Sequence, residues 1–223
     1  MEAGKVGIKL FGVSILILFL SEAGSVYLFS VFGDHHMLVL GGIRALQLAS
    51  FLVAVFFFGR GMSDIGLAKD HIIPGIMKGL AWSILFGLSA CIVLAVVLLT
   101  GIDVLRLLHT RLPAHGNDIL IFFLVGGLVA PVVEEVLFRG ILYGFFRRWG
   151  IGVALVMSTL FFVLAHQAVH FVQITGGIIF AVSYEKEGYL MVPIMIHILG
   201  NLSLFTLSLY AESTIIPILS MYF

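Results

Sequence analysis

Residues 128–140 read LVAPVVEEVLFRG and place three ionisable residues, Glu134, Glu135 and Arg139, inside an otherwise apolar stretch. The apolar run extends on both sides, from about residue 118 to 147, and is long enough for a helix that crosses a bilayer. Ionisable groups at bilayer depth are costly, and they mark functional positions. The stretch therefore predicts a membrane helix that carries a functional polar group.

The composition of the whole chain agrees with this prediction. Of its 223 residues, 61% are hydrophobic and 11% are charged, and the mean hydropathy is +1.19. A soluble domain has about 25% charged residues. Recurring apolar runs of about 20 residues predict α-helices rather than the alternating strands of a barrel. The net charge is zero and no basic cluster occurs, so no nucleic-acid partner is expected. The lone Cys91 excludes an internal disulfide framework.

The predicted fold is all-α: a polytopic transmembrane helical bundle in a single membrane domain. The first apolar run is too long for the core of a signal peptide and contains Glu22, so we interpret it as a span. Residues 1–117 are expected to supply three surrounding helices and an outer loop, and residues 118–223 the helical core. The apolar tail 213–223 is too short to span and is expected to form at most a short eighth helix. The seven predicted spans are 6–32, 37–59, 74–100, 118–147, 151–169, 170–185 and 189–210.

The distribution of Lys and Arg predicts the orientation. If the N-terminus is cytoplasmic, the outer side carries only Arg106 and Arg111. The inner side then carries eight basic residues: Lys5, Lys9, Arg60, Lys69, Lys78, Arg147, Arg148 and Lys186. Cytoplasmic loops are enriched in Lys and Arg, so the N-terminus is expected inside. The small size and short loops favour a bacterial inner membrane as the location.

The three ionisable residues are predicted to have unequal roles. Glu135 precedes Arg139 by four residues, which is the favourable order for an ion pair along a helix. Adjacent helical residues point about 100° apart, so Glu134 faces elsewhere and needs another partner. An unpaired carboxylate suits a general base. The alternative, a purely structural knot of all three charges, weighs equally on this motif alone.

Two further segments carry polar side chains at membrane depth. His166 lies late in the fifth predicted span, and His197 and Asn201 share one face of the seventh. Two donors on one face could bind an oxyanion, whereas the alternative is hydrogen bonding between helices. Glu134, His166, His197 and Asn201 lie about 20, 24, 12 and 18 Å from the cytoplasmic ends of their predicted helices. These overlapping depths favour one shared site. Glu22 and Arg44 are expected to form a separate, structural pair between the first two spans.

The motifs Glu134-Glu135-x-x-x-Arg139, Phe162-x-x-x-His166 and His197-x-x-x-Asn201 occur in this order on separate helices. Together they resemble the CAAX protease and bacteriocin-processing family of intramembrane endopeptidases. The resemblance covers about residues 118–210 and implies catalytic roles for four residues. Glu134 would activate a water molecule with the help of His166, while His197 and Asn201 would bind the oxyanion. Glu135 and Arg139 would be structural or would position the substrate.

No cofactor is expected, because relatives in this family imply a glutamic, metal-free mechanism. The alternative is a zinc metalloprotease in which Glu134, His166 and His197 bind the metal, since two His and one Glu are a normal zinc set. No His-Glu-x-x-His motif occurs in the sequence.

The expected activity is hydrolysis of a peptide bond near the C-terminus or in a membrane segment of a protein or peptide substrate. A prenylated tail, a leader peptide and a C-terminal sorting helix all remain open. The other functions considered are a proton-coupled transporter and a non-catalytic membrane scaffold or immunity protein. No inverted repeat or pair of broken helices favours a transporter.

Overall fold

The computed structural model describes residues 6–32, 36–102, 108, 110–113, 116–166 and 171–211. Every regular element in these ranges is helical. The long helices are α1 (Ile8–Val31), α2 (His36–Phe58), α3 (Lys69–Leu99), α8 (Ile151–Leu164), α9 (Phe171–Glu187) and α10 (Met191–Tyr210). A further continuous helical stretch comprises α5 (Gly116–Leu124), η3 (Val125–Val129), α6 (Ala130–Glu135), η4 (Val136–Tyr143), α7 (Gly144–Phe146) and η5 (Arg147–Trp149). A short helix, η2 (Met62–Ile65), precedes α3.

The all-α membrane bundle predicted from the sequence is confirmed. Each of the seven predicted spans corresponds to a helix, and five helices are long and apolar enough to cross a membrane. The fifth predicted span was too long, because α8 ends at Leu164 rather than at residue 169. With 14 residues it is only about 21 Å long, shorter than a bilayer core. The tail 213–223, the proposed eighth helix, lies outside the described residues.

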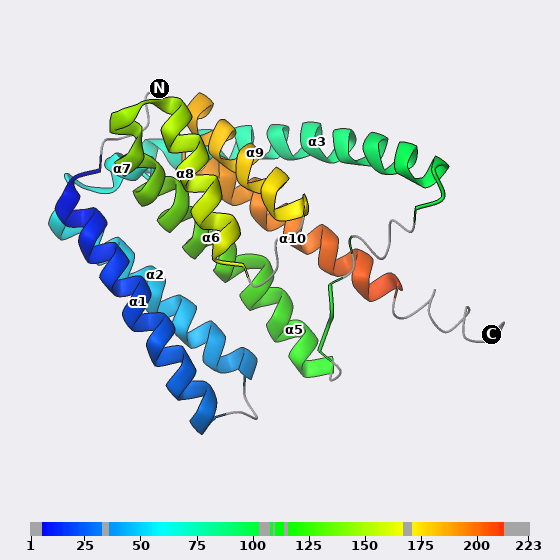
Figure 1. Cartoon of the computed structure of the whole chain (residues 1–223), viewed down its shortest axis with the longest axis horizontal. Helices are drawn as coiled ribbons and strands as arrows, with labels where there is room; N and C mark the ends of the chain where they lie inside the picture. Colours follow the sequence, from blue (N-terminus) through cyan, green and yellow to red (C-terminus); the bar gives the residue numbers. More distant parts are fainter. Residues whose placement is uncertain are drawn as a thin grey trace.

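The continuous stretch from α5 to η5 forms the centre of the bundle (Figure 1). In that view α1 and α2 lie side by side on one flank, and α8, α9 and α10 lie on the other. All eight residues of η4 are buried, which follows from this central position. The core around it draws side chains from several helices, such as Leu10, Phe51, Ile141, Tyr184 and Leu190. The acids of the 128–140 stretch therefore lie directly before a fully buried helical segment.

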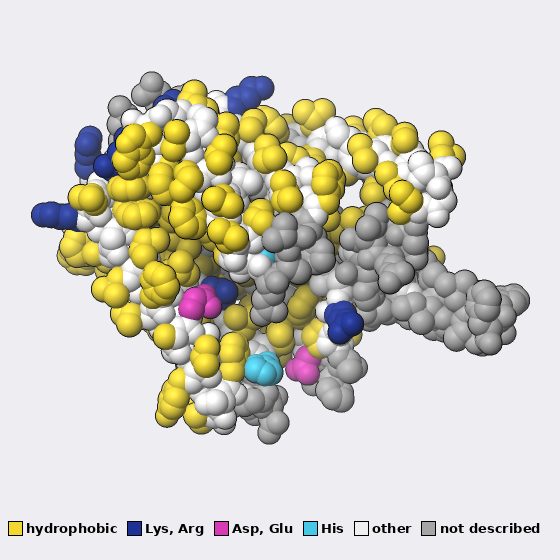
Figure 2. Space-filling model, in the orientation of Figure 1, with side chains coloured by type: hydrophobic (Ala, Val, Ile, Leu, Met, Phe, Trp, Pro, Cys, Tyr) yellow, Lys and Arg dark blue, Asp and Glu magenta, His cyan; other side chains and the backbone are white. Residues whose placement is uncertain are grey.

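Most of the outer surface is apolar, as Figure 2 shows for one face. Large hydrophobic side chains such as Phe19, Leu88 and Val156 are more than half exposed. Such a surface is unfavourable in water and suits a lipid environment. The exposed face of the bundle therefore agrees with a membrane protein.

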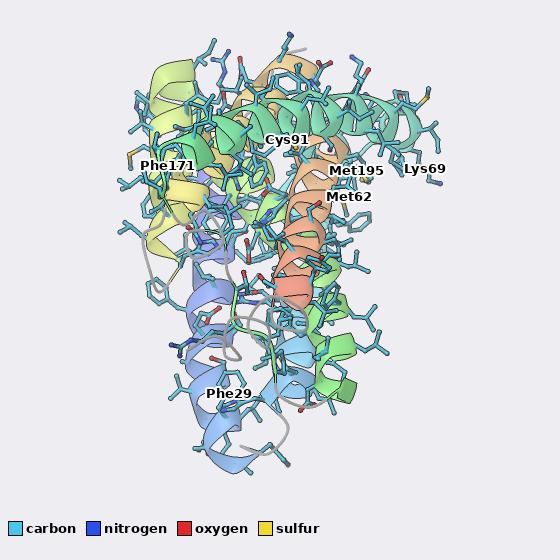
Figure 3. The ribbon with its side chains drawn as sticks, turned by 90° about the vertical axis from the view of Figure 1, so that its right-hand side faces the viewer. Phe29, Met62, Lys69, Cys91, Phe171 and Met195 are labelled. Carbon is cyan, nitrogen blue, oxygen red and sulfur yellow. The ribbon has the colours of Figure 1, made fainter. Side chains whose placement is uncertain are left out.

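Helices α3 and α10 pack closely at Gly75 and Gly79, in the first half of α3. A Cβ atom at Gly75 would lie 2.7 Å from Met191 Cβ, and one at Gly79 would lie 2.6 Å from Met195 Cβ. Further along α3, the space around Gly87 is open. Figures 1 and 3 show the consequence: α3 crosses one end of the bundle at a steep angle to α1 and α2, and its second half diverges from α10.

Glu22 and Arg44 form the predicted pair between α1 and α2. Arg44 Nη1 donates to Glu22 Oε1 at 2.8 Å and to Gln47 Oε1 at 2.7 Å. The buried Gln47 in turn donates to Ser21 Oγ at 2.7 Å. These hydrogen bonds connect the two helices, so the network has a structural role in this part of the molecule.

A contact between two glycines joins the turn before α3 to the turn before α10. Gly66 and Gly188 both have positive φ, 73° and 70°, which favours glycine. A Cβ at Gly66 would lie 2.7 Å from Gly188 O, so no larger residue fits. Leu190 N donates to Gly66 O at 3.1 Å. This contact fixes the start of α10, the helix that carries His197 and Asn201.

Candidate active site

Glu134 and Glu135 end helix α6, between two π-helical segments, η3 and η4. π-Helical turns are rare and often occur at functional sites, because the extra residue changes where side chains point. The two acids are in different environments: the Glu134 side chain is 21% exposed and the Glu135 side chain is 0% exposed. The unequal environments expected from the helical geometry are therefore present.

Glu135 forms the predicted ion pair with Arg139. Arg139 Nη1 donates to Glu135 Oε1 at 2.9 Å, and both side chains are fully buried. Arg139 Nη2 donates to the carbonyl oxygen of Gly177 in α9 at 3.1 Å. A buried charge is tolerated when it is paired and hydrogen-bonded. Arg139 thus neutralises Glu135 and connects the central helix to α9.

His197 lies between the two acids. Its Nδ1 is 2.8 Å from Glu135 Oε1 and its Nε2 is 3.8 Å from Glu134 Oε2. A carboxylate accepts hydrogen bonds, so Nδ1 carries the proton and Nε2 faces Glu134. At 3.8 Å the second contact is too long for a hydrogen bond. The sequence had placed His197 with Asn201 in an oxyanion site, and its contact with Glu135 was not expected.

Glu134 is the partly exposed acid, and it has an unused acceptor. Its Oε2 is buried and has no hydrogen-bond partner among the described residues. Oε2 of Glu135 also lacks a partner there, but the Glu135 side chain is fully buried and its other oxygen is paired with Arg139 and His197. Buried polar atoms without a partner are uncommon and often have a functional reason. The position of this oxygen, facing His197 Nε2, is therefore where a substrate atom or a water molecule would gain most from binding.

His166 joins this group through an aromatic ring. It follows the last turn of α8, where its Nδ1 is 2.7 Å from the carbonyl oxygen of Phe162. A carbonyl accepts, so Nδ1 is the donor and Nε2 remains available as an acceptor. The Phe162 ring lies 4.6 Å from the His166 ring and 5.7 Å from the His197 ring, measured between centroids. His166 is thus close to the site without a direct contact to either acid that the structure records.

Asn201 lies one turn after His197 on α10, and its amide is already partly used. Nδ2 donates to the carbonyl oxygen of Gly126 in η3 at 2.9 Å. The amide group has two N–H donors, so one remains available. Asn201 therefore connects α10 to the π-helical segment before the acids, and it is half-buried rather than enclosed.

The donors do not form a metal-binding group in the described part of the chain. There, no three His, Cys, Asp or Glu side chains lie close enough together to hold a metal ion. The zinc set considered above, Glu134, His166 and His197, thus gains no support from the geometry. The expectation that no cofactor is needed stays a prediction.

Two residues that the motifs did not indicate also contact the site. Phe180 stacks on the His197 imidazole, with centroids 4.6 Å apart and planes 20° apart. Gly177 provides the carbonyl that accepts from Arg139. Both lie on α9, which carries none of the three motifs. The pair Gly176-Gly177 within an apolar helix was the available signal, since it indicates close packing.

The fold and the site together describe a helical membrane bundle whose central helix carries two acids beside a histidine. Residues 116–203 match the family model described as "Type II CAAX prenyl endopeptidase Rce1-like". The chain is also similar to the membrane-embedded CAAX protease MroQ of Staphylococcus aureus (strain USA300), with 29% identity over 142 residues. That match covers 60% of this chain and 57% of MroQ. No solved structure matches the chain. The matches confirm the resemblance to CAAX proteases that the three motifs indicated, and the family model locates it in residues 116–203.

Proposed function

We propose that this protein is an intramembrane endopeptidase that uses Glu134 to activate water. The observation that carries the proposal is the buried Glu134 Oε2, which faces His197 Nε2 and has no hydrogen-bond partner among the described residues. A carboxylate in this state accepts a proton from a bound water molecule. The similarity of residues 116–203 to CAAX endopeptidases supports peptide hydrolysis as the reaction.

In the proposed reaction, a water molecule binds between Glu134 and His166. As the water oxygen attacks the scissile carbonyl, Glu134 accepts its proton and a tetrahedral intermediate forms. When the C–N bond breaks, Glu134 transfers that proton to the leaving amine. His166 contributes Nε2 as a second acceptor that orients the water, because its Nδ1 is held by Phe162 O.

The oxyanion is proposed to bind to His197 and Asn201. Asn201 has one N–H left after its hydrogen bond to Gly126 O. His197 would donate through Nε2 when this nitrogen carries a proton, while Nδ1 is held by Glu135 Oε1. Donors fixed in this way before the reaction lower its barrier most effectively, because they need little reorganisation. Glu135 and Arg139 have the structural role of holding His197.

The proposed substrate is a protein or peptide whose C-terminal or transmembrane segment lies in the bilayer. Chemically, the site requires only an extended peptide bond that reaches membrane depth. A prenylated tail, a leader peptide and a C-terminal sorting helix all meet this requirement. We propose the lipid bilayer as the second partner and no nucleic acid.

The proposed location is the cell membrane of a bacterium, with a cytoplasmic N-terminus. The Lys and Arg side chains in Figure 2 gather mainly at the end of the molecule near the N-terminus. Arg148 Nη2 donates to Val6 O at 2.6 Å. A basic residue that the prediction assigns to the cytoplasmic side therefore lies beside the first described residue of the chain. Such asymmetry supports the orientation predicted from the sequence.

The deciding experiment compares membrane proteomes by mass spectrometry. Cells that express the wild type are compared with cells that express Glu134→Ala or Glu134→Gln, with melting temperatures as the control for folding. We expect membrane-anchored fragments, or released peptides, that depend on Glu134 and resist a chelator. Retained cleavage by Glu134→Ala would refute the role of Glu134, and loss of cleavage with the chelator would support the zinc alternative. Proton-coupled flux in proteoliposomes without peptide cleavage would favour a transporter.

A further inference from the structure

Phe180 of helix α9 contacts both the Arg139 guanidinium and the His197 imidazole. Phe180 stacks on the His197 ring at 4.6 Å, and the Arg139 guanidinium carbon lies 5.1 Å from the Phe180 centroid. The Phe180 side chain is itself buried. One ring therefore contacts both partners of Glu135, the acid that receives hydrogen bonds from His197 and Arg139.

A second ring completes this arrangement. Phe162 of α8 lies 4.4 Å from the Arg139 guanidinium carbon and meets Phe180 edge to face, at 6.0 Å and 90°. It also meets His197 edge to face, at 73° between the planes. Phe162 belongs to the His166 motif, whereas Phe180 belongs to none. The two rings and the Glu135 hydrogen bond leave the His197 imidazole little freedom to turn.

The backbone around Phe180 is fixed by contacts on both sides. One turn before it, Gly177 O accepts from Arg139, and a Cβ on Gly177 would meet Thr159 at 2.9 Å and Phe162 at 3.3 Å. Further along α9, Glu185 accepts from Tyr143 Oη at 2.7 Å and is paired with Arg147 at 2.9 Å. Helix α9 is thus bonded to the central helical stretch both before Phe180, at Gly177, and after it, at Glu185.

The orientation of His197 matters chemically because its two nitrogens face different acids. Nδ1 must point to Glu135 so that Nε2 points to Glu134. A ring turned about its Cβ–Cγ bond would lose the hydrogen bond to Glu135 and would move Nε2 away from the proposed oxyanion position. Stacking on a flat aromatic face opposes that rotation, and aromatic pairs of this kind prefer offset or edge-to-face geometry at such distances.

We propose that Phe180 is a positioning residue: its ring holds the His197 imidazole in the orientation that the peptidase reaction requires. This inference rests on the proposed function and deepens it. Phe180 touches no reacting atom in the mechanism, so its effect passes through His197. Misplacement of a catalytic group by a fraction of an ångström lowers turnover more than it lowers substrate binding.

The test compares Phe180→Leu with Phe180→Tyr and with Phe11→Leu. Phe180→Tyr keeps the aromatic face. Phe11→Leu is the matched control. It also removes one ring of a stacked pair, because Phe11 stacks on Phe145 at 3.8 Å, away from the site. Kinetics on a substrate peptide identified with the wild type give kcat and KM separately. We expect Phe180→Leu to lower kcat about tenfold with KM unchanged, while Phe180→Tyr and Phe11→Leu keep the wild-type kcat.

A second measurement does not depend on activity. Histidine labelled with ¹⁵N reports the His197 ring by NMR, and His197→Gln identifies its signals. We expect Phe180→Leu to shift these signals, and Phe180→Tyr and Phe11→Leu to leave them in place. The inference is overturned if Phe180→Leu leaves both kcat and the His197 signals unchanged. If the wild type cleaves no peptide, the proposed function fails, and the NMR result alone decides whether Phe180 positions His197.

Discussion

Glu135 Oε1 accepts two hydrogen bonds, from Arg139 Nη1 and from His197 Nδ1, in a fully buried position. Its negative charge is therefore shared by a guanidinium and an imidazole from two different helices. This arrangement supports the proposed division of the two acids into one structural and one reactive member. The Glu135 side chain is fully buried, whereas the Glu134 side chain is partly exposed.

The first prediction concerns the Glu135–Arg139 pair. Arg139→Gln leaves Glu135 as a buried charge that only His197 can neutralise, and such losses cost about 3–5 kcal/mol. We expect a clear fall in the melting temperature of the purified protein in detergent. The double variant Glu135→Gln/Arg139→Gln removes both charges and should recover part of that stability. If the double variant is no more stable than Arg139→Gln, the buried charge is not the cause.

The second prediction concerns the free N–H of Asn201. Asn201→Asp replaces this donor by an acceptor, so it should lower kcat about 10²–10³-fold, as the loss of an oxyanion donor does. Folding is checked by circular dichroism. Thr206→Val is the control, because the Thr206 hydroxyl only donates to Leu202 O on the same helix and is exposed. Equal activity of Asn201→Asp and the wild type would argue against an oxyanion role.

At the scale of elements, the sequence predicted the helices better than their ends. Apolar runs identified all seven helices, because apolar length is a strong signal in a membrane protein. The end of α8 was placed too late, at residue 169, because Ala165, Ala168 and Val169 continue the apolar pattern of the sequence. The chain turns there through local bonds: His166 N donates to Val163 O, and the His166 ring donates to Phe162 O. Hydropathy does not record such capping.

The site was predicted in part, for reasons that particular residues make clear. The i, i+4 spacing of Glu135 and Arg139 is local, so their pairing followed from the sequence. The contact of His197 with both acids joins residues 62 positions apart, and no local pattern specifies it. Phe180 was not identified, because an aromatic residue in an apolar helix has the same pattern whether it faces lipid or an imidazole.

The third prediction concerns the packing of α3 on α10. A Cβ at Gly79 would approach Met195 Cβ at 2.6 Å and Val192 O at 3.2 Å, so Gly79→Ala should separate the helices and destabilise the protein by about 1–3 kcal/mol. Gly87→Ala is the matched control on the same helix, because nothing lies within 4 Å of its Cβ position. Thermal unfolding in detergent should show a loss for the first variant only. A similar change in both would contradict the packing described.

For the whole molecule, the fourth prediction concerns its orientation. Phe32, after α1, and Lys69, at the start of α3, are both exposed and are expected on opposite sides of the membrane. In a Cys91→Ser background, Phe32→Cys should react with a membrane-impermeant thiol reagent in intact cells. Lys69→Cys should react only after the cells are opened. The reverse pattern would place the N-terminus outside.

The shared oxygen of Glu135 also has a consequence for biosynthesis. Its two donors enter the membrane at different times, since Arg139 lies on the central helix and His197 on α10, the last helix that the structure describes. When only the first 190 residues have been synthesised, both acids are present but His197, the imidazole that contacts Glu135, is not. The proposed catalytic group can therefore form only late in translation, after α10 has been made.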